Sequence, residues 1–222
     1  MRKSLNVLIA CEESKAECLA FRALGYRAFS CDLQPCRQGT PEGTHVIADV
    51  RQLFGDHLQF KTQDGKRHSV SHWDLIIAHP PCTYLCKVGS IWMYKDGELD
   101  LNRVKLQDEA RKFFYECLAA PARYVAVENP LPMARARLLK PSTFICPSWF
   151  GVKYTKKTLF WLKNLPPLMP TIIHSHPKEY VRASRGKYRS RTFPQVAEAM
   201  AMQWSAYILD DLNKRTDGKG HK

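Results

Sequence analysis

Short apolar runs alternate along the chain with segments whose apolar residues recur every three or four positions. Six short runs predict buried β-strands, at residues 6–10, 26–31, 45–48, 73–78, 124–127 and 158–162. Three segments have helical spacing, at residues 15–24, 102–119 and 194–209. Strands that alternate with helices form a parallel sheet covered on both faces, so the sequence predicts an α/β fold with a Rossmann-like, doubly wound, mostly parallel sheet.

Turn-forming residues separate these elements. The pair Pro80-Pro81 stops the strand before it, because proline has no N–H donor and fixes its own φ. Residues 56–71 are polar and contain Asp64-Gly65, which predicts a surface hairpin or loop. Residues 83–101 are predicted to form a long loop.

Length and composition indicate one domain. The chain has 222 residues, of which 45% are hydrophobic and 25% charged, enough for a single core. Residues 1–210 are predicted to form this domain, and residues 211–222 a charged, disordered tail.

No apolar stretch approaches the roughly 20 residues that cross a bilayer, and the N-terminal apolar run is too brief for a signal peptide. We therefore expect a cytoplasmic protein with its eight cysteines reduced.

The charge balance points to a polyanionic partner. The formal net charge is +13, from 34 basic and 21 acidic residues spread along the chain. Nucleic acid is the leading partner class, and a role in solubility alone is the alternative. No metal is expected, because the chain has no Cys-x-x-Cys pair and the pair His174 and His176 follows no cysteine at zinc-finger spacing.

Four reactive or charged residues come just after predicted strands: Asp32, Asp49, Cys82 and Glu128. In doubly wound folds, ligands gather beyond the carboxyl ends of the strands, so these residues are the leading functional candidates. The aspartates follow early strands, which favours a nucleoside-binding half, and the other two follow later strands, which favours a reacting half. Each also has a structural alternative, as a buried thiol, a turn or helix cap, or an ion-pair partner.

A cysteine and a glutamate at neighbouring strand ends suit methylation of carbon 5 of a pyrimidine. That carbon becomes nucleophilic only after a thiolate adds to carbon 6 of the ring. Negative charge then builds at ring nitrogen 3, where a carboxyl group whose pKa is raised in a dry pocket can donate a proton. Cys82 is the candidate nucleophile and Glu128 the candidate acid.

The segment Pro80-Pro81-Cys82 after one strand and Glu128-Asn129 after the next resemble the two catalytic motifs of cytosine-5 DNA methyltransferases, in the same order and with the same intervening helix. The chain is most similar to short, phage-type members of this family, over residues 6–205. The resemblance implies an S-adenosylmethionine-dependent enzyme that methylates cytosine in DNA through a covalent adduct with the Pro-Cys cysteine. It also implies protection of DNA in a restriction-modification system.

The resemblance further implies a cofactor site. Asp32 lies where the family holds the ribose, Asp49-Val50 where it holds the adenine, and residues 190–194 resemble the segment that closes over the methionine part. The implied cofactor-binding residues are Ala10, Cys11, Glu12, Asp32, Leu33, Asp49, Val50, Pro80, Arg191 and Thr192. Lys156 and Thr158 stand in place of the family's Gln-x-Arg-x-Arg motif, which supports the base, and lysine lacks the planar fork of arginine.

Two features depart from the family pattern. Residues 10–14, the turn after the first strand, contain no glycine, which restricts the backbone angles beside the cofactor. The family's target-recognition domain is also missing, and a short basic cluster suited to DNA phosphates stands in its region, formed by Arg182, Arg185, Lys187 and Arg189. So short a segment reads few bases. The enzyme would therefore be nearly unselective, use a separate specificity partner, or act on single-stranded rather than double-stranded DNA.

Two other functions stay open at this point. The same thiol chemistry could modify a free pyrimidine nucleotide, or the chain could be a non-catalytic, nucleic-acid-binding relic of the family. Trp92 and Tyr94, in the predicted loop, could stack on an extruded base or pack on the loop itself. His79 stands where the family has a small residue, and the sequence assigns it no role.

Overall fold

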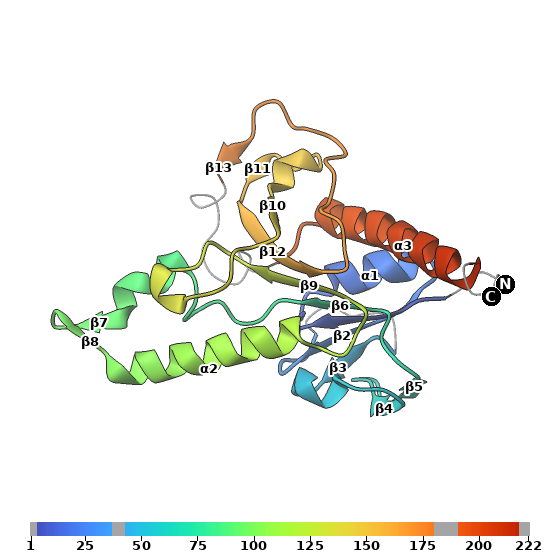
Figure 1. Cartoon of the computed structure of the whole chain (residues 1–222), viewed down its shortest axis with the longest axis horizontal. Coiled ribbons are helices and arrows are strands. Elements are labelled where there is room, and N and C mark those ends of the chain that lie inside the picture. The colour runs from blue at the N-terminus through green and yellow to red at the C-terminus, as the bar shows by residue number, and fades with distance from the viewer. Residues whose placement is uncertain (1–3, 37–42, 180–190, 218–222) are drawn as a thin grey trace.

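The computed structural model describes residues 4–36, 43–179 and 191–217, and a seven-stranded sheet lies at its centre (Figure 1). The strands of this sheet are β1 Asn6–Ala10, β2 Arg27–Asp32, β3 His45–Ile47, β6 Leu75–Ala78, β9 Tyr124–Asn129, β10 Thr143–Ile145 and β12 Thr158–Lys163. Their order is β10-β12-β9-β6-β1-β2-β3. The five strands from β9 to β3 run parallel, whereas β12 is antiparallel to both of its neighbours. The predicted α/β, Rossmann-like, mostly parallel sheet is confirmed.

Three helices cover the two faces of the sheet (Figure 1). Helices α1 (Ala16–Ala23) and α3 (Pro194–Asp217) pack on one face, and α2 (Leu101–Leu118) packs on the other. Successive strand residues point to opposite faces, so the entirely buried strand β1 contributes to both cores. Its Ile9 lies in the cluster that contains Trp204 of α3, and its Leu8 lies in the cluster that contains Phe114 of α2.

Shorter elements connect these layers. The 3-10 helices are η1 Val50–Leu53, η2 Lys87–Met93, η3 Ala134–Ala136 and η4 Pro147–Trp149. The small ladders pair β4 (Leu58–Lys61) with β5 (Arg67–Val70), β7 (Tyr94–Lys95) with β8 (Glu98–Leu99), and β11 (Tyr154–Thr155) with β13 (Lys178–Glu179). The β4–β5 pair is the hairpin predicted within residues 56–71.

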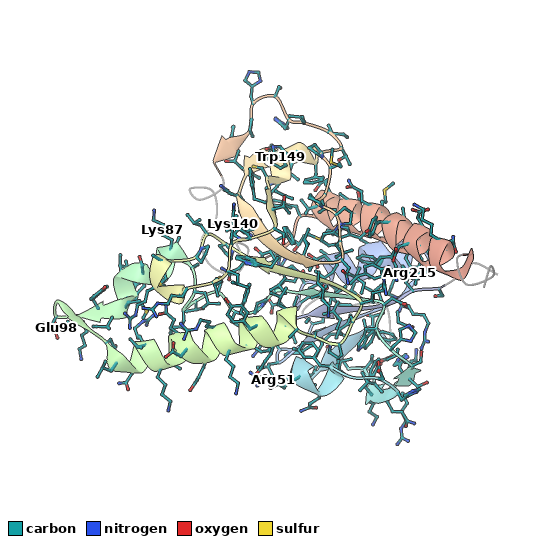
Figure 2. The ribbon with its side chains drawn as sticks, in the orientation of Figure 1. Arg51, Lys87, Glu98, Lys140, Trp149 and Arg215 are labelled. Atoms are coloured by element: carbon teal, nitrogen blue, oxygen red, sulfur yellow. The ribbon has the colours of Figure 1, made fainter. Side chains whose placement is uncertain are left out.

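The segment after the paired prolines differs from its prediction. Residues 83–101, expected to be a loop, contain η2 and the β7–β8 hairpin. This segment projects away from the sheet beside the start of α2, and Figure 2 shows Lys87 and Glu98 on it. Strand β10 was not predicted, because it is a three-residue edge strand that pairs only with β12.

The last helix is longer than predicted. Helix α3 continues to Asp217, so the prediction of a disordered tail is wrong for residues 211–217. Ion pairs at i,i+4 spacing stabilise the added turns, with Lys214 2.6 Å from Asp210 and Arg215 2.8 Å from Asp211. The remaining residues of the predicted tail, 218–222, lie outside the described residues. Within the described part of the chain, no helix combines the length and the apolar character that a membrane span requires.

Candidate active site

A histidine and a glutamate meet where strands β6 and β9 end. The two strands are parallel and pair Ala78 with Val127, so the residues that follow, His79 and Glu128, lie side by side. Because side chains alternate along a strand, both belong to the face that α1 and α3 cover. His79 Nδ1 lies 3.3 Å from Glu128 Oε2.

A second glutamate holds the other side of the histidine ring. His79 Nε2 lies 2.7 Å from Oε2 of Glu17, a residue of α1 whose side chain is fully buried. The Thr192 hydroxyl donates a hydrogen bond of 2.8 Å to the other oxygen of Glu17. One imidazole therefore bridges two carboxylates from different elements. We call Glu17, His79 and Glu128 the carboxylate–histidine line.

The charges within this line differ from the prediction. Burial alone would lower the pKa of His79, but the charge of Glu17 and hydrogen bonds to Glu128 and Glu17 raise it well above its ordinary value. Burial raises the pKa of Glu128, yet the hydrogen bond and charge of His79, together with the charge of Lys156, outweigh burial and lower it. The expectation of a raised pKa at Glu128 is wrong, because a cationic histidine lies against it instead of apolar groups.

A third glutamate, Glu12, lies at the start of α1. Its carboxylate oxygens accept hydrogen bonds from the backbone N–H groups of Glu17, at 2.9 Å, and Cys18, at 3.4 Å. Glu12 thus caps the helix, since Lys15 at the N-cap position makes no side-chain cap. Burial and the charge of Glu17 raise the pKa of Glu12 to about 7. The resemblance implies that Glu12 binds the cofactor, whereas in the structure its carboxylate caps α1.

A small cavity lies against Glu128. Its volume is about 30 Å³, and its lining includes four residues implied by the resemblance, Lys156, Thr158, Arg191 and Thr192. Glu128 Oε1 is buried and has no hydrogen-bond partner among the described residues. A buried, unpaired carboxylate oxygen is expected to receive a donor from a ligand or a water molecule. The cavity has room for about one water molecule, so it does not admit a pyrimidine in this conformation.

One segment separates this cavity from a larger groove. Arg191, Thr192 and Phe193 line the cavity and also a groove of about 770 Å³ between α1 and α3. We call these three residues the shared wall.

Cys82 lies partly exposed beyond the paired prolines and is not among the residues that line the cavity. The backbone N–H groups of Leu85 and Cys86 donate to the Cys82 carbonyl at 3.0 and 2.9 Å. This single turn brings the Cys86 thiol near the Cys82 thiol, so that each thiol shifts the pKa of the other. The charge of Glu128 also acts on the Cys82 thiol, so both predicted catalytic residues share one end of the sheet.

The two cysteines form a thiol pair with one favoured site for negative charge. The hydrogen bond from Cys82 lowers the pKa of Cys86 to about 6, against the effect of burial, and backbone N–H groups of Gly89 and Val88 add to this. The hydrogen bond with Cys86, followed by burial, raises the pKa of Cys82. Negative charge on the pair is therefore favoured on Cys86 over Cys82.

Alkylation tests this thiol pair. Cys86 is expected to react with iodoacetamide at pH 7 faster than the other cysteines, with a pH midpoint near its pKa of about 6. In a Cys82→Ala variant the hydrogen-bond donor is gone, so the pKa of Cys86 rises and its alkylation at pH 7 slows. Peptide mass spectrometry measures both rates. A Cys36→Ala variant is the control, and an unchanged Cys86 rate in Cys82→Ala would contradict the pairing.

The predicted nucleoside-binding aspartates lie at the ends of β2 and β3. Burial, and then nearby groups that include Asp32 and Asp49, raise the pKa of Cys11, so both aspartates flank the turn after β1. Asp32 Oδ1 accepts a hydrogen bond of 2.9 Å from the Gln34 backbone. Asp49 caps η1 and pairs with Arg51 at 3.0 Å. The structural roles considered for these aspartates are thus realised, and their oxygens keep lone pairs for a ligand.

The turn after β1 adopts backbone angles that glycine usually supplies. Cys11 and Lys15 both have φ of 61°. Of the other implied contacts, Ala10, Val50 and Pro80 are buried, and Leu33 is exposed beside Asp32. A sharp turn flanked by two carboxylates suits a nucleoside, because the carboxylates can accept hydrogen bonds from ribose hydroxyls and an exocyclic amino group. These residues therefore fit the nucleoside half of S-adenosylmethionine.

The predicted nucleic-acid contacts have two outcomes. The basic cluster of Arg182, Arg185, Lys187 and Arg189 lies outside the described residues. Trp92 on η2 and Tyr94 on β7 are 63% and 58% exposed, so a large part of each side chain faces solvent.

The sequence left three side chains of the candidate site without a role. Cys86 could have been found from its spacing of four from Cys82, because four residues make one helical turn. His79 and Glu17 had no local signal, since they are 62 residues apart in the chain.

The sheet, with β12 inserted antiparallel between β9 and β10, defines the class of this chain as an α/β protein with a Rossmann-like, mostly parallel sheet. No family model and no curated protein matches the sequence. Among solved structures, one similar chain is a presumed DNA modification methyltransferase encoded within a prophage of E. coli. The TM-score is 0.44 and the identity 16%, and the match covers 77% of this chain and 52% of that one. This chain thus spans about half the length of that protein.

Proposed function

We propose that this protein transfers a methyl group from S-adenosylmethionine to carbon 5 of cytosine in DNA, through a covalent adduct with Cys82. The proposal rests on one observation, that two cysteine thiols and a glutamate lie near one another. A pair of neighbouring thiols, Cys82 and Cys86, and a glutamate with a buried, unpaired oxygen lie at the same end of the parallel sheet. Pyrimidine methylation needs this combination of a sulfur that adds to carbon 6 and a carboxyl group at the nitrogen 3 edge. The net charge of +13 supports DNA as the substrate.

The thiol pair generates the nucleophile. As the Cys82 sulfur forms its bond to carbon 6, the Cys82 proton passes to the Cys86 thiolate beside it. The electron pair of the ring's 5,6 double bond then becomes available at carbon 5. Cys86 therefore acts as the base for Cys82, and the pair keeps its single negative charge until the adduct forms.

Glu128 and the residues around the small cavity hold the base. Glu128 Oε1 contacts the nitrogen 3 edge of the ring. The carboxyl group of Glu128 donates the proton that nitrogen 3 takes up as negative charge builds on the ring. Lys156 and Thr158 line the same cavity: Lys156 donates to the carbonyl oxygen of the ring, and the Thr158 hydroxyl, which donates to the Lys156 carbonyl at 3.0 Å, holds the lysine's backbone in place. Entry of the base requires the shared wall of Arg191, Thr192 and Phe193 to move.

Bound S-adenosylmethionine supplies an electrophilic methyl group for carbon 5. Asp32 and Asp49 would hold its nucleoside half, and the shared wall would close over its methionine half. After methylation, the carbon 5 proton leaves to water, Cys82 departs from carbon 6 with the bonding electron pair, and its sulfur takes back the proton held by Cys86, which restores the starting thiol and thiolate.

A trapping experiment tests this function. DNA that contains 5-fluorocytosine should form a stable covalent complex in the presence of S-adenosylmethionine, because fluorine cannot leave carbon 5 as a proton does. Mass spectrometry should find the adduct on Cys82, and Cys82→Ala should abolish it. Cys36→Ala, which removes a thiol elsewhere, should form the adduct at the parent rate.

The form of the substrate decides between the candidate functions. Single-stranded and double-stranded 5-fluorocytosine oligonucleotides are compared with 5-fluorodeoxycytidine monophosphate at equal concentration. Reaction with the mononucleotide alone would favour a nucleotide-modifying enzyme. DNA binding that is unaffected by Cys82→Ala, with no adduct formed by the parent, would indicate a non-catalytic relic of the family.

A further inference from the structure

The geometry points to His79 as the proton store for Glu128: the carboxylate–histidine line holds one mobile proton, which passes from His79 to Glu128 when a cytosine binds. This inference rests on the proposed function, because cytosine is the base that needs the proton. In this role His79 is a positioning residue, since it acts on the reacting ring only through Glu128.

Three contacts fix the direction of transfer. Glu17 Oε2 lies 2.7 Å from His79 Nε2, so Nε2 keeps its proton whether the ring is charged or neutral. Nδ1, which faces Glu128 Oε2 at 3.3 Å, is then the only ring nitrogen that can release a proton. Glu17 is itself held by the Thr192 hydroxyl, so the far end of the line is fixed.

The carboxylate–histidine line explains how Glu128, whose pKa is lowered, can still deliver a proton to the ring. An ionised carboxylate accepts hydrogen bonds but cannot protonate ring nitrogen 3. The proton therefore comes from His79 Nδ1. It moves to Glu128 Oε2, and rotation of the protonated carboxyl group then turns it towards nitrogen 3, while carbon 6 gains the Cys82 sulfur. When Cys82 leaves, the same proton returns through Glu128 to His79, so the line ends in the state in which it began.

The surroundings of His79 determine its charge. The groups that face it are Glu17 and Glu12 at the start of α1, Glu128 on β9, Lys156 before β12, and Arg191 in the shared wall. The nearest contacts are carboxylates, and they favour the imidazolium form. Folding stability from this group is fully present below the ordinary histidine pKa of about 6.5 and is lost as pH rises through the higher folded value.

A histidine NMR titration tests the resting state without any catalytic turnover. In the parent protein, the His79 resonance, identified by its loss in His79→Gln, should stay in the imidazolium form through neutral pH. Glu17→Gln and Glu128→Gln should each move its titration to lower pH, by roughly 1 to 3 units, because each removes a neighbouring charge. An ordinary titration near pH 6.5 in the parent would overturn the inference.

The pH profile of adduct formation tests the transfer. In the parent, the rate should fall at high pH when His79 loses its proton. In His79→Gln this fall should occur at lower pH, by roughly 1 to 3 units, because Glu128 alone must then hold the proton. The acid limb, set by the thiol pair, should stay where it is. A profile of unchanged shape and lower height would show that His79 only supports the fold, and would overturn the inference.

The two tests separate this inference from the proposed function. Adduct formation at Cys82 together with an ordinary His79 titration would reject the proton store and leave cytosine methylation standing. A raised His79 titration without any Cys82 adduct would reject the methylation, and the transfer of the proton to a bound cytosine would be rejected with it. Thermal unfolding of each variant checks that the fold is retained.

Discussion

Replacing Glu128 with glutamine is expected to slow methyl transfer to DNA by about 10² to 10⁴-fold, the usual contribution of a general acid or base. Glutamine keeps the shape of the side chain, and its amide oxygen can still accept from His79 Nδ1. It cannot relay a proton to ring nitrogen 3, so carbon 6 addition builds up uncompensated charge. Initial rates with radiolabelled S-adenosylmethionine and saturating DNA measure the effect.

The matched control for this variant is Glu109→Gln. Glu109 is an exposed residue of α2, on the opposite side of the sheet from the carboxylate–histidine line. It carries the same chemical change at a site remote from the proposed reaction, so its rate should equal that of the parent. A Glu128→Gln rate within about twofold of the parent would remove Glu128 from the mechanism.

Truncating Trp204 to alanine is expected to lower the free energy of unfolding by about 3 to 5 kcal/mol. Trp204 lies on α3 and is fully buried, with its ring 6.0 Å from the ring of Phe160 in edge-to-face contact. Its indole N–H donates to the Pro166 carbonyl at 3.1 Å. The substitution leaves a cavity between α3 and the sheet and an unpaired carbonyl, and denaturant unfolding at neutral pH measures the loss.

Met202 provides the comparison on the same helix. Its side chain is 63% exposed, so Met202→Ala should change the free energy of unfolding by no more than roughly 0.5 kcal/mol. If Trp204→Ala costs less than about 1 kcal/mol, α3 is not packed on the sheet as described here.

The sheet followed from local patterns. The runs at residues 6–10 and 158–162 match β1 and β12 closely, because a buried strand needs apolar side chains on both faces wherever helices cover both. Strand β10 and the hairpin β7–β8 were missed, since two- and three-residue strands leave too little pattern to detect. The end of α3 was set too early because its last turns are charged and held by ion pairs between side chains.

The candidate site was predicted only in outline. The neighbouring positions of Cys82 and Glu128 followed from their places after consecutive strands. The ionisation of Glu128 did not follow from the sequence, because neighbouring groups can either raise or lower the pKa of a buried carboxyl group. The group next to Glu128 is His79, which is 49 residues away in the sequence. The cavity against Glu128 is also far smaller than a pyrimidine requires.

The sequence by itself determined which residues enter the sheet, which helices cover it, and which reactive side chains stand at strand ends, because these depend on the spacing of apolar residues along the chain. The tertiary structure alone decided the protonation states and the pairing of side chains. Glu17, His79, Glu128 and Thr192 come from four separate segments, and only their packing brings the charges within a few ångströms of one another. Electrostatic interactions depend on that distance and on burial, neither of which residue order records.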